Sequence, residues 1–176
     1  SLGALIPLKG HDIVIDAAAR LPGVTLWIAG EGPERTRLQA RIDRLGVGDR
    51  IRLLGAVPHG DVPVLAAAAD VMALASAREG LANAWMEALA SGTPIVIPDV
   101  GGARQVLRPS AAAGRIAVRT PQAFAEAIAA LLASPPDPAA VRATVEGFTW
   151  AANSAHLHAH YRRLASAHRD RLTAAA

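Results

Sequence analysis

Two glutamates and a lysine are the residues whose types and spacing suggest chemistry. Glu79 and Glu87 lie eight positions apart in the stretch REGLANAWMEALASGTPIVIPDVGG, which begins at Arg78. Because Gly80 disfavours one helix through both positions, we expect Glu79 on a loop and Glu87 inside a helix that begins near Asn83. Both carboxylates can then border one cleft. In the alternative interpretation, Glu79 only balances a helix N-terminus and Glu87 is solvated.

The surroundings of Glu87 favour a ligand for its carboxylate. Its neighbours from Trp85 to Ala90 are apolar, so the helix is expected to be mostly buried. A buried carboxylate needs hydrogen-bonding partners. The two adjacent hydroxyls of a ribose would supply them.

Lys9 stands in PLKGHD, where an expected strand gives way to a helix. A cation beside the N–H groups of a helix start suits a phosphate, although a lone loop lysine can simply be solvated. Gly30 opens GEGPER, which matches a dinucleotide fingerprint only in part, because Arg35 stands where a third glycine is needed. A tight strand-to-helix turn explains these glycines equally well.

The elements that must position these residues alternate along the chain. This order predicts an α/β fold with a Rossmann-like parallel sheet of about six strands, helices on both faces and a helical tail. The expected strands are Leu2–Ile6, Val24–Ala29, Ile51–Leu54, Val71–Leu74, Ile95–Ile97 and Ile116–Val118. The expected helices are His11–Leu21, Glu34–Leu45, Asp61–Ala69, Asn83–Ala90 and Gln122–Ala133.

A proline cluster at Ser134–Pro138 divides the chain. We expect a nucleotide-sugar-binding domain at residues 1–134 and a C-terminal helical tail at residues 135–176. The tail carries Phe148, Trp150 and Tyr161, so it is expected to pack on the same domain or on a missing N-terminal domain.

Composition excludes several function classes. The net charge is +3, but the arginines are scattered among acids, so no nucleic-acid-binding face is indicated. The absence of cysteine excludes disulfides and thiolate metal sites, and His156, His158 and His160 fit a helix surface better than a metal site. Without an apolar run near the length of a membrane span, we expect a soluble, cytoplasmic protein, for which peripheral membrane contact stays open.

The sequence resembles the C-terminal, donor-binding domain of the group 1 retaining glycosyltransferases of GT-B fold over essentially its whole length. The signature of that family, two glutamates separated by seven residues in a longer pattern, reads SAREGLANAWMEALASGTPIV from Ser76 to Val96. The stretches LKGHD, IAGEGP, IRLLGAVP and DVGG follow in the family's order, and the tail is similar to its terminal crossover helix.

The resemblance implies transfer of a hexose from a nucleoside-diphosphate (NDP) sugar to an unknown acceptor, with retention and with no obligatory cofactor or metal. It implies one role for each matching position. Lys9 would bind the diphosphate and assist catalysis, Glu79 the donor sugar, Gly80, Leu81 and Ala82 the sugar or phosphate through backbone N–H groups, Glu87 the ribose, and Gly30 and Val57 the nucleotide.

Two positions depart from the family pattern. Ala4 stands where an arginine usually joins the lysine on the phosphates, and Gln105 stands where a glutamate is common. An inactive sugar-nucleotide sensor or interaction module therefore remains an alternative, as does, more remotely, a nicotinamide-dependent enzyme based on Gly30. The acceptor site is expected on a missing N-terminal domain, so the chain is expected to be an excised domain or a subunit with a separate partner.

Overall fold

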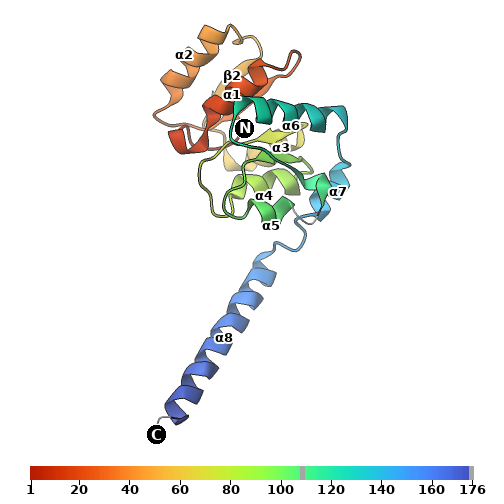
Figure 1. The fold of residues 1–176 in the computed structure, drawn as a ribbon. Coiled ribbons are helices and arrows are strands. Elements are labelled where there is room, and N and C mark those ends of the chain that lie inside the picture. Colours follow the sequence, from red (N-terminus) through yellow and green to blue (C-terminus); the bar gives the residue numbers. More distant parts are fainter. Residues whose placement is uncertain (108–109, 175–176) are drawn as a thin grey trace. The chain divides into compact units, whose positions relative to one another are not determined.

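The computed structural model describes residues 1–107 and 110–174 (Figure 1). Two compact units make up the chain, Ser1–Val145 and Glu146–Ala176, and each is described by itself. The first unit contains every strand of the described residues, and the second consists of one long helix with the residues that lead into it.

Strands and helices alternate through the first unit, as the sequence predicts. The strands are β1 (Leu26–Ala29), β2 (Ile51–Gly55), β3 (Met72–Ala73), β4 (Ile95–Ile97) and β5 (Gly114–Ile116). The helices are α1 (His11–Ala19), α2 (Arg35–Leu45), α3 (Val62–Ala67), α4 (Asn83–Ala90), α5 (Ala103–Leu107), α6 (Pro121–Ala133) and α7 (Pro138–Ala143). Short 3₁₀ helices occupy η1 (Pro7–Lys9), η2 (His59–Asp61) and η3 (Ala111–Ala113).

All strand pairs in the described part of the chain are parallel, which confirms the fold class, but that part forms five strands instead of about six. Among the described residues, β1 and β2 form one sheet, and β3, β4 and β5 form a second in that order. The expected first strand, Leu2–Ile6, forms a single bridge between Leu2 and Ala29. Because the chain turns into η1 at Pro7, only a short segment can run beside β1.

Both faces of the second sheet are buried, as expected for parallel strands. Ala73 and Val96 point into a core built with α1, α2 and α6. Their neighbours Met72, Ile95 and Ile97 point the other way, into a core built with α4, α5 and α7. The pleat therefore sorts successive residues of one strand onto two helical layers.

The second unit is dominated by α8 (Trp150–Ala174). Trp150 and Tyr161 are 86% and 61% exposed, and Phe148 just before the helix is 48% exposed. The sequence predicted one tail from residue 135, whereas α7 packs against α4 and so belongs to the first unit. What the tail packs on stays a prediction. None of the helices in the described ranges is long and apolar enough to cross a membrane.

Candidate functional site

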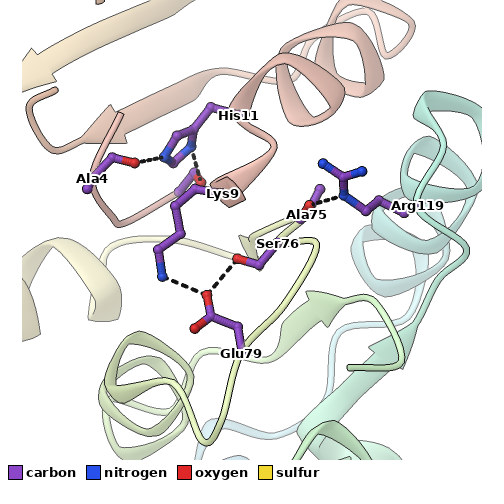
Figure 2. A network of polar contacts seen from close by, with 8 residues as sticks. Ala4, Lys9, His11, Ala75, Ser76, Glu79 and Arg119 are labelled. Atoms are coloured by element: carbon purple, nitrogen blue, oxygen red, sulfur yellow. Dashed lines mark hydrogen bonds and ion pairs between the residues drawn. The ribbon is translucent and has the colours of Figure 1, made fainter. Parts of the chain in front are cut away.

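An ion pair joins two of the predicted site residues at the carboxyl end of the strands. Lys9, at the end of η1, places Nζ 2.6 Å from Oε1 of Glu79, on the loop between β3 and α4 (Figure 2). Ser76 donates its hydroxyl to the same oxygen at 2.7 Å. The side chains of Lys9 and Glu79 keep 21% and 12% of their exposure, so the pair is largely buried but remains open to a ligand.

Close backbone packing holds the two halves of this pair together. The N–H of Ala77 donates to the carbonyl of Leu8 at 2.8 Å, which ties the loop after β3 to η1. Gly10 has a φ of 63°, and a Cβ there would overlap the carbonyl oxygen of Ala75. Glycine at this position therefore lets the start of α1 reach the end of β3, which brings Lys9 within reach of Glu79.

The Gly101–Gly102 loop fixes Glu79 from the other side. The N–H of Gly102 donates to the carbonyl of Gly80 at 2.7 Å. Gly101 has a φ of 50°, and a Cβ there would overlap the carbonyl oxygens of Glu79 and Gly80. The two glycines thus allow the loop after β4 to lie directly on the loop that carries the carboxylate.

Backbone donors gather just beyond Glu79. Within residues 1–107 and 110–174, the N–H groups of Gly80, Leu81 and Ala82 donate to no acceptor. They stand immediately before α4, whose N-terminus adds the partial positive charge of its dipole. A cation and unpaired N–H groups at one strand end favour an anionic ligand there.

His11, which sequence reasoning missed, supports the segment beneath Lys9. Its Nε2 donates to the carbonyl of Ala4 and its Nδ1 accepts from the Ser1 hydroxyl, both at 3.2 Å. Burial and, to a smaller extent, the nearby terminal amino group lower the pKa of His11 to about 4, so the ring is neutral at pH 7. One partner of His11 is a backbone carbonyl, which every residue has, and the other is a serine hydroxyl. The sequence around His11 therefore contains no pattern that predicts these two hydrogen bonds.

Arg119 is a second basic residue that the sequence did not single out. It follows β5, and its Nε donates to the carbonyl of Ala75 at 2.7 Å (Figure 2). Ala75 directly precedes Ser76, the partner of Glu79. The arginine therefore fixes the same carbonyl of Ala75 that Gly10 packs against.

The structure does not bring Glu87 to this ion pair. Glu87 is half-buried on α4 and lines an apolar cavity of about 420 Å³ together with Ala84 and Ala88. Neither Lys9 nor Glu79 lines that cavity. Within the described ranges, the carboxylate of Glu87 makes no hydrogen bond or ion pair, so it retains its capacity for a hydroxyl ligand.

The two other predicted nucleotide contacts lie near the turns that follow β1 and β2. Gly30 donates its N–H to the carbonyl of Gly55 at 2.8 Å, and a Cβ on Gly30 would overlap the carbonyl of Gly3. Val57 is half-buried between β2 and η2. Gly30 is thus required for close approach between neighbouring turns, whatever it binds.

The two positions that depart from the family pattern are both exposed. Ala4 offers only a methyl group, and its carbonyl is taken by His11. Gln105 lies on α5, one turn after the Gly101–Gly102 loop. No cluster of three or more histidines, aspartates or glutamates in the described part of the chain is arranged to hold a metal ion.

These features define an α/β domain of the Rossmann type with a polar site at the carboxyl ends of its parallel strands. Residues 1–146 match the family described as "Glycosyl transferases group 1". The chain belongs to this family, which confirms the resemblance found in the sequence.

This chain spans less than half the length of the following similar proteins. The lipopolysaccharide core biosynthesis glycosyltransferase LpsE of Rhizobium meliloti is 35% identical over 133 residues, which cover 76% of this chain and 38% of that protein. Sucrose-phosphate synthase of Thermosynechococcus elongatus superposes with a TM-score of 0.79 at 28% identity. The superposed residues cover 94% of this chain and 45% of the synthase. HepE of Anabaena, in complex with UDP, gives a TM-score of 0.71 at 28% identity over 84% and 42% of the two chains.

Proposed function

We propose that this chain is the donor-binding part of a retaining glycosyltransferase that transfers a hexose from an NDP-sugar to an acceptor. The observation that carries the proposal is the Lys9–Glu79 pair beside three unpaired backbone N–H groups. A cation, a carboxylate and N–H donors suit a ligand that combines phosphate with sugar hydroxyls. The structure of HepE with UDP, a similar protein, supports a uridine nucleotide as one such ligand.

Lys9 binds the diphosphate of the donor, and Glu79 binds its sugar. When the bond between the sugar and the diphosphate breaks, its electron pair stays with the departing nucleoside diphosphate, which gains negative charge. Lys9 stabilises this charge, and the stabilisation is larger in the transition state than in the bound donor. Glu79 accepts from Lys9 and Ser76 through Oε1, and among the described residues its Oε2 makes no bond, so it can accept a hydroxyl of the sugar. Gly80, Leu81 and Ala82 donate their N–H groups to the sugar or the phosphates.

Glu87, Gly30 and Val57 contribute the nucleotide part of the site. The half-buried carboxylate of Glu87 lacks a protein partner within the described ranges, and two ribose hydroxyls would satisfy it. Gly30 and Val57 lie on the turns after β1 and β2, where a base can approach the backbone. No metal or cofactor has an obligatory part in this proposal.

The acceptor is proposed to bind elsewhere. This chain spans between 38% and 45% of LpsE and sucrose-phosphate synthase, so a site for a sugar or lipid acceptor would come from an N-terminal domain or a separate subunit. Retention, the identity of the hexose and peripheral contact with a membrane belong to this proposal for the whole enzyme.

A sugar-nucleotide sensor without catalytic activity is the second candidate. The exposed methyl group of Ala4 cannot bind phosphate, so Lys9 lacks the arginine that usually assists it in this family. Ala4→Arg separates the two candidates: for the donor-binding part of an enzyme it raises the affinity for the diphosphate, whereas for an interaction module it leaves the binding of the protein partner unchanged.

Calorimetric titration of this chain with UDP and GDP tests the proposal. We expect dissociation constants below the millimolar range and at least about a tenfold loss in Lys9→Met, because one charge-assisted phosphate contact is removed. Arg20→Met, an exposed change of the same charge at the end of α1, is the matched control and keeps the parent affinity. Absence of binding by the folded parent chain to either nucleotide would refute donor binding.

A further inference from the structure

The carboxylate of Glu79 accepts two hydrogen bonds through one of its oxygens. Lys9 Nζ lies 2.6 Å from Oε1, and the Ser76 hydroxyl donates to the same atom at 2.7 Å. The two donors come from different elements, since Lys9 ends η1 and Ser76 follows β3, and Figure 2 shows them approaching Oε1 from two directions. Oε1 is therefore held independently by a cation and by a neutral hydroxyl.

The two donors differ in how easily they can leave Oε1. The Lys9 side chain keeps 21% of its exposure, and its ammonium lies at the end of a flexible stem, so it can exchange Glu79 for water or for a phosphate. Ser76 is 0% exposed, and Glu79 is the only partner of its hydroxyl among residues 1–107 and 110–174. A buried hydroxyl without a partner is unfavourable, so Ser76 keeps its bond to Glu79.

The backbone around Ser76 fixes the position of its hydroxyl. The carbonyl of Ala75 accepts from Nε of Arg119 at 2.7 Å, and the N–H of Ala77 donates to the carbonyl of Leu8 at 2.8 Å. The residues on both sides of Ser76 are thus tied to other elements of the first unit. Since a single torsion connects the serine backbone to its side-chain oxygen, the hydroxyl has little freedom to move.

A phosphate that binds Lys9 would leave Ser76 as the partner that stays on Glu79. In the described part of the chain, Oε2 of Glu79 makes no bond, so this oxygen can accept a hydroxyl of a ligand. Without any bond to Oε1, the long glutamate side chain could turn into other rotamers. The bond from a buried, fixed hydroxyl prevents this rotation and keeps Oε2 in one place.

We propose that Ser76 is a positioning residue for the donor sugar. It holds the Glu79 carboxylate in the orientation that accepts a sugar hydroxyl while Lys9 moves to the diphosphate. Its effect passes through Glu79, and Ser76 itself touches neither the sugar nor the phosphates. This role rests on the proposed donor function, and it gives Ser76 a contribution to sugar binding but none to nucleotide binding.

Calorimetry on Ser76→Ala tests this division. UDP-glucose, UDP-N-acetylglucosamine and GDP-mannose serve as donor probes, and UDP and GDP are the matching ligands without the sugar. We expect Ser76→Ala to weaken the tightest-binding donor by at least about fivefold and to change the affinity for the matching diphosphate by less than about twofold, because only a hydrogen bond to the carboxylate is lost. Thr144→Val, which removes a partly buried hydroxyl at the end of α7, is the control and should change neither affinity.

A second background separates positioning from a structural role. In Glu79→Ala the carboxylate is absent, so adding Ser76→Ala should cause no further loss of donor affinity beyond about twofold. Ser76→Cys fills the same space with a weak donor and should repeat the selective loss, which keeps the test available if the alanine variant is unstable.

Three results would overturn this role. Equal changes in donor and diphosphate affinity in Ser76→Ala would mean that the whole loop is disturbed, and a further loss in the Glu79→Ala background would mean that Ser76 acts through another group. Unchanged donor affinity in both Ser76→Ala and Ser76→Cys is the third. Absence of nucleotide binding by the folded parent chain is a distinct outcome, because it refutes the proposed donor function itself.

Discussion

Lys9 and Glu79 neutralise each other in this structure, so in the proposed site a donor phosphate would compete with Glu79 for Lys9. We therefore predict that Glu79→Gln and Lys9→Met have opposite effects on UDP. Glu79→Gln releases the lysine and raises UDP affinity by up to about fivefold, the range expected for a partly exposed ion pair. Lys9→Met lowers it. Calorimetry on both variants, with Arg20→Met as control, measures the difference.

The same two variants distinguish binding of the phosphates from binding of the sugar. If Glu79 contacts the donor sugar, Glu79→Gln should lose the preference of the parent chain for UDP-glucose over UDP. Equal losses of UDP affinity in Glu79→Gln and Lys9→Met would contradict this division of roles, because a carboxylate that competes for the lysine cannot also strengthen phosphate binding.

The neutral ring of His11 predicts the pH dependence of stability. Burial holds its pKa at about 4 in the folded state, whereas an unfolded histidine titrates near 6.5. Between these values the unfolded chain binds more protons, so the free energy of unfolding falls as pH decreases from 6.5 to 4. The full fall attributable to His11 is up to about 3 kcal/mol.

Urea unfolding of the parent chain and of His11→Gln from pH 8 to pH 4 measures this effect. The glutamine amide can still donate to Ala4 but does not titrate, so the slope below pH 6.5 should become shallower. The Ser1 amino group, whose pKa burial also lowers, is present in both chains, so the comparison is made below pH 6.5, where His11 itself titrates in the unfolded chain. His59→Gln, at an exposed position of η2, should keep the parent slope, and an unchanged slope in His11→Gln would contradict the assignment.

At the scale of elements, the contact between the two loops after β3 and β4 depends on Gly101. A Cβ there would overlap the carbonyl oxygens of Glu79 and Gly80, and the φ of 50° is unfavourable for alanine. We predict that Gly101→Ala destabilises the fold by at least about 1 kcal/mol and weakens UDP binding, because the loop that carries Glu79 must move. Thermal unfolding and calorimetry measure both effects.

Gly48→Ala is the matched control for this change. Gly48 lies in the turn before β2, and a Cβ there would meet only the side chain of Ile42 at an ordinary distance of 3.9 Å. Its Tm should stay within about 2 °C of the parent value and its UDP affinity should not change. If both alanine variants behave alike, the loop contact does not position Glu79.

Element boundaries were predictable where local sequence decides them. The structure confirms α4 (Asn83–Ala90) and β4 (Ile95–Ile97) at the predicted residues, since glycine and proline separate a helical pattern from a β-branched run. The boundaries of other elements depend on hydrogen bonds to the neighbouring strand. β3 has two residues instead of four, and β5 is Gly114–Ile116 instead of Ile116–Val118, because strand limits depend on the neighbouring strand.

The candidate site was predictable only in its local part. The Glu79 loop, the Gly101–Gly102 loop and Lys9 carry recognisable sequence patterns. Arg119 and His11 do not, because they bond to carbonyl groups of Ala75 and Ala4 that only the tertiary fold brings near. The roles predicted for the site residues remain predictions until a ligand is bound.

At the scale of the whole molecule, the division into two compact units predicts that the first folds without the second. Both hydrophobic clusters lie within Ser1–Val145, and in the second unit Trp150 and Tyr161 are mostly exposed. A chain that ends at Val145 should therefore unfold cooperatively, with a Tm within about 4 °C of the full chain, since few stabilising contacts are removed.

The UDP affinities of the shortened and the full chain can be compared in the same way. Lys9, Glu79 and Glu87 all lie in Ser1–Val145, so the shortened chain should bind UDP with the affinity of the full chain to within about twofold. Circular dichroism should show that the lost signal is helical, because the removed part contains α8. A shortened chain that is cooperative and stable but no longer binds UDP would place part of the donor site in residues 146–176, and the site would then have to be assigned to both units.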